Sequence, residues 1–149
     1  YYLTLFNYIC IIQETGRCLE NKEILEETIP KIKEKFGDDN GMYALYLHAY
    51  SKVLTEMRCP EEAMKVMDQL IPLMLKHMNE WNAKVSELGR ISCLAMLGRE
   101  EEAKAKAYEL REYFVKLSGE NCQQVPYIDR LLKKIDNGEF HMDNVPKQV

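Results

Sequence analysis

The chain has 149 residues, a formal net charge of −4 and an isoelectric point near 5.5. Its 46% of hydrophobic and 30% of charged residues are typical of a folded protein, and the composition is too apolar for intrinsic disorder. The acidic balance argues against a nucleic-acid surface, which needs a basic face. Seven glycines and five prolines leave little room for β-turns, so the composition favours an all-α fold.

The cysteines and the hydropathy pattern indicate a compartment. Five cysteines are scattered along the chain without a Cys-x-x-Cys pair. Free thiols of this kind suit a reducing environment, so we expect a cytoplasmic protein. The sequence has no signal peptide and no run of about 18 apolar residues, and we expect no membrane contact. The chain begins at Tyr1 without an initiator methionine, so we expect it to be part of a larger protein.

The spacing of apolar residues predicts seven helices. In chain order, six of them cover about residues 2–14, 19–36, 42–57, 60–78, 81–97 and 100–117, and a seventh, opened by Pro126, ends near residue 136. Segments that contain glycine or proline separate most of them. Pro30 and Pro72 fall inside predicted helices, where we expect each proline to kink its helix.

A short motif returns along the chain with a nearly fixed step. Arg17, Arg58 and Arg99 are 41 residues apart and lie between predicted helices, and the prolines of Ile29-Pro30 and Ile71-Pro72 are 42 apart. Such a period is typical of a helical repeat array, in which each helix-turn-helix unit packs on its neighbours. We therefore predict an α–α superhelix over residues 1–136, with repeats at about 1–40, 41–80 and 81–120, a capping helix at about 124–136, and a flexible tail at 137–149.

The repeated unit resembles the tetratricopeptide repeat family. Gly98 and Arg99 are followed by acidic residues and by Ala103, as in that family's signature between its two helices. Weaker copies of the signature place Ala63 and Asn21 where Ala103 stands. The unit of about 41 residues exceeds the standard of about 34. It resembles the long-unit variant of kinesin light chains and bacterial regulators.

The resemblance implies a binding groove on the concave side, lined by the first helix of each unit. In this groove we expect Gln13, His48, Lys52, Thr55, Glu56, Ser92 and Met96. His48 and Lys52 would form a basic pair there. We predict a non-enzymatic interaction module that binds a protein or peptide, as an extended segment or as a partner helix, in this groove.

Other functions remain open from the sequence. The long units also resemble the sensor halves of bacterial signalling proteins, whose DNA-binding or nucleotide-cyclase output lies elsewhere in the chain. The uncapped apolar edge from Tyr1 to Phe6 is compatible with self-association as a scaffold. We expect no catalytic site, metal or cofactor, because the three histidines are far apart and the sequence lacks a metal-ligand pattern or a phosphate-binding glycine loop.

The predicted fourth helix is rich in methionine, with Met64, Met67, Met74 and Met78. Methionine is flexible and polarizable, so it fills irregular cores and also forms adaptable binding surfaces. The sequence is compatible with either role for these four residues.

Overall fold

The computed structural model describes residues 1–142. In this part the chain forms seven α-helices and no strand. They are α1 (Tyr2–Glu14), α2 (Cys18–Phe36), α3 (Gly41–Glu56), α4 (Pro60–His77), α5 (Glu80–Met96), α6 (Glu100–Ser118) and α7 (Gln124–Asp136). Every predicted helix is confirmed, with ends that differ by at most two residues. None of the helices in the described part is long and apolar enough to span a membrane.

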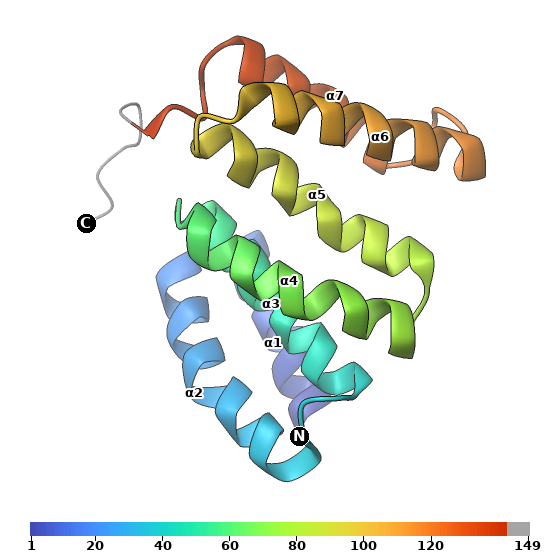
Figure 1. Cartoon of the computed structure of the whole chain (residues 1–149). Helices are drawn as coiled ribbons and strands as arrows, with labels where there is room; N and C mark the ends of the chain where they lie inside the picture. Colours follow the sequence, from blue (N-terminus) through green and yellow to red (C-terminus); the bar gives the residue numbers. More distant parts are fainter. Residues whose placement is uncertain (143–149) are drawn as a thin grey trace.

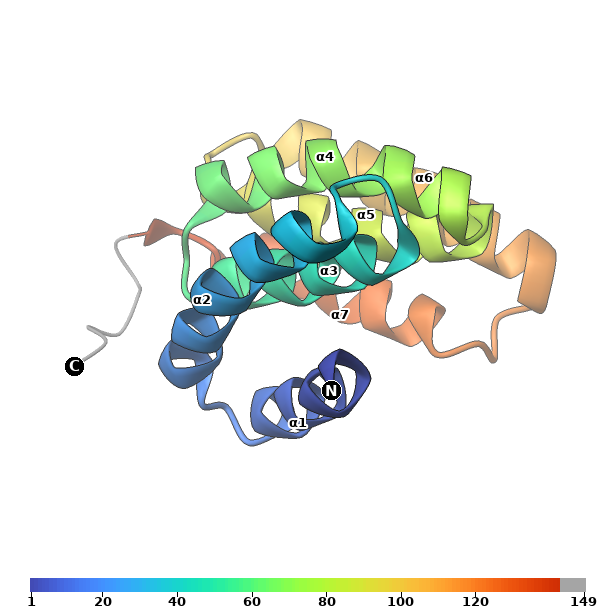
Figure 2. The ribbon, with the colours of Figure 1, turned by 90° about the horizontal axis from the view of Figure 1, so that it is seen from below.

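The helices pack as a stack of antiparallel hairpins. Each helix contacts the next one along the chain, and the first helices α1, α3, α5 and α7 also contact one another in order. Figure 1 shows the hairpins stacked in chain order, from α1 and α2 at one end to α6 and α7 at the other. In the view of Figure 2, α4 and α6 lie along one side and α1 and α7 along the other. The predicted all-α superhelix is confirmed.

Local sequence explains where the central helices begin. The side chains of Asn40 and Asn79 accept hydrogen bonds of 2.8 Å from the backbone N–H groups of Tyr43 and Asn82, and so cap α3 and α5. Pro60 occupies the first turn of α4, where its missing N–H removes no intrahelical bond. Pro30 and Pro72 lie inside α2 and α4 as predicted, and both helices continue past them. The kink expected at each proline stays a prediction.

The turn between the two helices of a unit has the same backbone conformation in all three units. Gly16, Arg58 and Gly98 have positive φ angles of 74°, 61° and 79°. In each turn the next backbone N–H donates to a carbonyl five residues earlier, with N···O distances of 2.9–3.4 Å. This left-handed closure of a helix favours glycine. Gly138 closes α7 in the same way, with φ of 71° and a bond of 3.0 Å from Glu139 N to Lys134 O.

These turns correct the predicted register of the repeats. The equivalent positions are Gly16, Arg58, Gly98 and Gly138, which are separated by 42, 40 and 40 residues. Matching the three arginines is therefore wrong, because Arg58 occupies the position that the other turns fill with glycine. By the same register, α7 occupies the position of a first helix, like α1, α3 and α5.

The core lies between the first and second helices along the whole stack. Each second helix buries four residues at identical spacing, namely Asn21, Leu25, Thr28 and Ile32 in α2, Ala63, Met67, Leu70 and Met74 in α4, and Ala103, Ala107, Leu110 and Phe114 in α6. The family resemblance placed a small residue at the first of these positions. In α2 this residue is Asn21, whose buried amide donates to the carbonyl of Ile9 at 2.9 Å.

The folded part extends beyond the predicted end at residue 136. Phe140 is buried, and the guanidinium carbon of Arg58 lies 5.6 Å from the centre of its ring. The prediction that the chain is a flexible tail from residue 137 onward is therefore wrong at Phe140. The remainder of the predicted tail, 143–149, lies outside the described residues.

Candidate functional site

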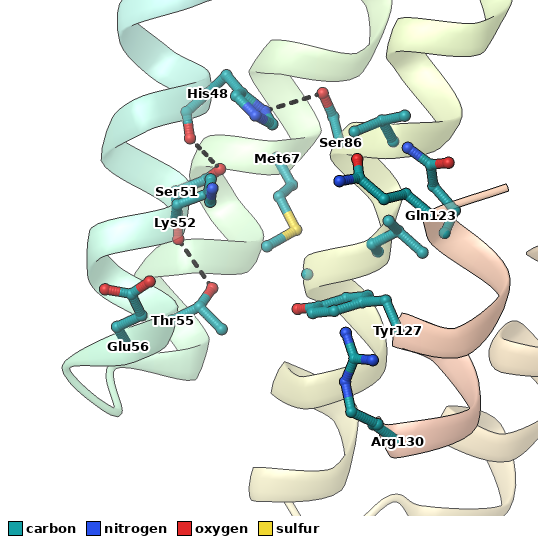
Figure 3. Close-up of a pocket in the computed structure, with 14 residues that line it drawn as sticks. His48, Ser51, Lys52, Thr55, Glu56, Met67, Ser86, Gln123, Tyr127 and Arg130 are labelled. Carbon is teal, nitrogen blue, oxygen red and sulfur yellow. Dashed lines mark hydrogen bonds between the residues drawn. The ribbon is translucent and has the colours of Figure 1, made fainter. Parts of the chain in front are cut away.

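A cavity of about 480 Å³ opens between α3, α5 and α7. This volume lies within the range of about 300–1,000 Å³ that is common for ligand sites. Figure 3 shows the α7 side chains opposite those of α3. The cavity is lined by residues of three first helices, of α4 and of the segment before α7: His48, Ser51, Lys52, Thr55, Glu56, Met67, Val85, Ser86, Leu88, Gly89, Gln123, Gln124, Tyr127 and Arg130.

The structure brings five of the seven predicted groove residues together. His48, Lys52, Thr55 and Glu56 follow one face of α3 and line the cavity. Gln13 of α1 lies beside them, because its amide nitrogen is 3.5 Å from the Glu56 carboxylate. These positions share a face through the helical spacing of three to four residues.

The other two predicted groove residues, Ser92 and Met96, are wrongly placed by the sequence analysis. Each side chain is only 5% exposed, and neither lines the cavity. Met96 belongs to the apolar core that α5 shares with Val125, Ile128 and Leu131 of α7, and Ser92 lies one helical turn before Met96. Because α7 packs against α5, it covers the part of α5 that carries Met96.

His48 is held by Ser86 across the α3–α5 contact. The Ser86 hydroxyl donates to the carbonyl of Asn82 at 3.0 Å, so it accepts from the His48 Nδ1–H at 3.1 Å (Figure 3). Burial, with a smaller contribution from Lys52, lowers the pKa of His48 to about 4. At neutral pH the imidazole is therefore uncharged, and the predicted basic pair consists of one cation, Lys52, beside a neutral ring.

Glu56 is the only carboxylate among the residues that line the cavity, and it is already engaged. It accepts from the thiol of Cys18 at 3.0 Å and from the Gln13 amide. Burial and the hydrogen bond to Glu56 raise the pKa of Cys18 to about 11, so the thiol stays protonated and keeps donating. These contacts fix Glu56 between the first two units.

The α7 wall supplies an aromatic ring and a second cation. The Arg130 guanidinium lies 5.8 Å from the centre of the Tyr127 ring. Burial and the nearby Glu56 carboxylate raise the pKa of Tyr127, so its hydroxyl remains a hydrogen-bond donor. Neither Arg130 nor Lys52 forms an ion pair with any residue in 1–142. The cavity therefore has two unpaired cations at its edge and one carboxylate that is already bound.

The floor of the cavity depends on a close approach between α4 and α5. A Cβ atom added at Gly89 would lie 2.5 Å from the Met67 methyl group. Met67 is fully buried, as expected for a methionine that fills the core, and it also contributes to the wall of the cavity. Thr55 Oγ1 and Cys93 Sγ, 3.6 Å apart, join α3 to α5 nearby.

Four residues that line the cavity were not predicted from the sequence, namely Gln123, Gln124, Tyr127 and Arg130. The sequence contained a signal for these residues, because the predicted start of the last helix follows the starts of the other first helices at the repeat spacing. The last helix was therefore a candidate first helix, and first helices are expected to line the groove. Among the α5 residues of the cavity, Gly89 had a weaker signal in the sequence, because it is a glycine in the middle of a predicted helix.

No protein-family model matches the chain, and searches of curated proteins and of solved structures give no match either. The resemblance to tetratricopeptide repeats thus stays a prediction. In the described part of the chain, no three His, Cys, Asp or Glu side chains are grouped so that they could hold a metal ion.

Proposed function

We propose that this chain is a protein-interaction module that binds a peptide segment or a partner helix in the cavity between α3, α5 and α7. The observation that carries the proposal is the arrangement of first helices from three successive units around one open cavity. Helical repeats present extended concave surfaces of this kind to their partners.

The lining supports a division of roles within the cavity. Val85, Leu88 and Met67 provide apolar surface for a hydrophobic side chain of the ligand. Apolar anchors in a pocket supply most of the affinity of such interfaces. Lys52 and Arg130, which have no ion-pair partner in the described part of the chain, favour an acidic residue next to that anchor. The neutral His48 and the Tyr127 hydroxyl add directional hydrogen bonds.

The test compares two double variants with the unchanged chain in affinity capture from the native extract, followed by titration calorimetry with the captured protein. Lys52→Glu with Arg130→Glu reverses both cavity cations. We expect the partner's dissociation constant to rise at least about tenfold, because the acidic ligand residue then faces two carboxylates.

The matched control is Lys65→Glu with Lys116→Glu, which changes the net charge equally at exposed positions outside the cavity. It should bind like the unchanged chain, and circular dichroism should show all three proteins equally folded. Equal binding by the cavity variant would place the partner elsewhere and reject the proposal.

A further inference from the structure

The hydrogen bonds around His48 fix which of its two ring nitrogens carries the proton. The Ser86 hydroxyl has one proton, which it donates to the Asn82 carbonyl, so its oxygen accepts from the Nδ1–H of His48 at 3.1 Å. Burial lowers the pKa of His48 to about 4, so the ring carries a single proton at neutral pH. This proton is on Nδ1, and Nε2 is therefore a hydrogen-bond acceptor.

The Nε2 atom of His48 is open to the cavity, which His48 lines (Figure 3). It forms no hydrogen bond to another residue of the described part of the chain. It also does not belong to the polar side-chain atoms that are buried there without a partner. A ligand that covers Nε2 has to supply an N–H or O–H group, because an acceptor that loses its water and stays unpaired weakens binding.

Other polar groups of the lining also lack partners. The side-chain amides of Gln123 and Gln124 and the hydroxyl of Tyr127 form no hydrogen bond within residues 1–142. Each glutamine amide can donate to a carbonyl and accept from an N–H group. The main chain of an extended peptide offers both groups at every residue except proline, whereas an α-helix has already paired them internally. These groups therefore match an extended segment better than a helix.

The size of the cavity agrees with this preference. Its volume is about 480 Å³. An α-helix with its side chains is about 10–12 Å across and rises about 5.4 Å per turn, so two turns occupy about 800–1,200 Å³. Two turns of a partner helix are thus too large for the cavity.

We propose that the ligand of this cavity binds as an extended segment and that one of its main-chain N–H groups donates to Nε2 of His48. The inference rests on the function proposed above and deepens it, since it chooses the extended segment over the partner helix. Ser86 is a positioning residue, because its oxygen holds the proton on Nδ1 and so keeps Nε2 available as an acceptor. Lys52 lies one turn further along α3, where it pairs with an acidic side chain of the same segment.

NMR of the ¹⁵N-labelled imidazole rings at neutral pH tests the position of the proton without any ligand. The signal of His48 is the one that His48→Leu removes, and we expect its proton on Nδ1. Ser86→Ala takes away the acceptor of this proton and should move it to Nε2. Ser51→Ala is the matched control and should leave the proton on Nδ1, because the Ser51 hydroxyl bonds to the main-chain carbonyl of His48 within α3, at 2.8 Å.

Two small amides test the direction of the hydrogen bond. N-Methylacetamide contains one peptide N–H group, and N,N-dimethylacetamide has the same carbonyl without it. We expect the first to shift the Nε2 signal of the unchanged chain and the second to leave it in place. In Ser86→Ala both should shift the signal, because Nε2–H then donates to the carbonyl that the two amides share.

A peptide from the captured partner tests the extended binding mode. Replacing its main-chain amides by esters, one at a time, removes a single N–H group in each peptide. At one position this should weaken binding at least about tenfold, because His48 Nε2 is then left unpaired. In Ser86→Ala the amide and ester forms should bind alike.

Three results would overturn the proposal. A proton on Nε2 in the unchanged chain, or an equal response to the two small amides, would exclude His48 as an acceptor. Ester peptides that all bind like the parent, or a loss that persists in Ser86→Ala, would show that His48 does not accept a main-chain N–H. These results leave the effect of Lys52→Glu with Arg130→Glu unchanged, so the cavity can bind a partner even where this inference fails. Conversely, equal capture by that double variant would reject the function proposed above, while the NMR results on His48 would stand.

Discussion

His48 links the groove to the stability of the fold. Its pKa of about 4 lies below the ordinary value of 6.5, mainly because protein atoms displace the water that would solvate the charged ring. The unfolded chain thus binds a proton at a pH where the folded chain does not. The contribution of His48 to the free energy of unfolding is therefore fully present above about pH 6.5 and is lost as the pH drops towards 4.

We expect the free energy of unfolding to fall by about 1 kcal/mol between pH 7 and pH 5.5. His48→Leu should remove this fall, and Leu88 occupies the equivalent position of α5. Urea unfolding of both proteins at the two pH values measures the difference. The carboxylates whose pKa is lowered, such as Asp39, titrate below this range. An equal fall in the variant would show that His48 does not carry the effect.

At the scale of the element, α5 packs closely on α4 because Gly89 has no side chain. Glycine in the middle of a helix costs about 1 kcal/mol relative to alanine. Gly89 is retained at a point where a Cβ atom would meet the end of the Met67 side chain. The contact thus sets both the spacing of the two helices and the floor of the cavity.

A double-mutant cycle tests this fit. In the unchanged chain, we expect Gly89→Ala to have a net effect near zero, because the gain in helix propensity is offset by the displacement of Met67. Met67→Ala alone should cost about 2–5 kcal/mol through the cavity that it leaves. In that background Gly89→Ala should stabilise the chain by about 1 kcal/mol, because the new methyl group has room. Urea unfolding gives all four values, and identical effects of Gly89→Ala in both backgrounds would exclude the coupling.

At the scale of the whole molecule, the buried residues are distributed unevenly along the stack. The first helix α1 buries only Ile9 and Ile12, whereas α3 buries eight residues and α5 nine. In a repeat array each unit is stabilised chiefly by its neighbours, so an end unit with a small buried surface opens first.

Native-state hydrogen exchange should show this gradient, with the α1 amides exchanging fastest among the helices and those of α3 and α5 slowest. Ile9→Ala removes a fully buried side chain that contacts the core of the first two units. We expect it to accelerate exchange in α1 and α2 and to leave α6 and α7 unchanged. Uniform acceleration along the chain would instead indicate that the stack opens as a single cooperative unit.

The sequence by itself determined the seven helices of the described part, their order and their stacking as hairpins. These features depend on apolar periodicity, asparagine and proline at helix starts and glycine at helix ends, all of which act within a few residues. The face of α3 that carries His48, Lys52, Thr55 and Glu56 followed from the same local spacing.

Only the tertiary structure decided the register of the middle unit, the closure of the groove by α7, the burial of Ser92 and Met96, and the loss of charge at His48. Each of these depends on which helix lies across from which. An arginine of the repeated motif can occupy a glycine position, as Arg58 does. A helix face becomes core or groove according to whether a distant segment covers it. These outcomes depend on contacts between units, and the local pattern of residues does not determine those contacts.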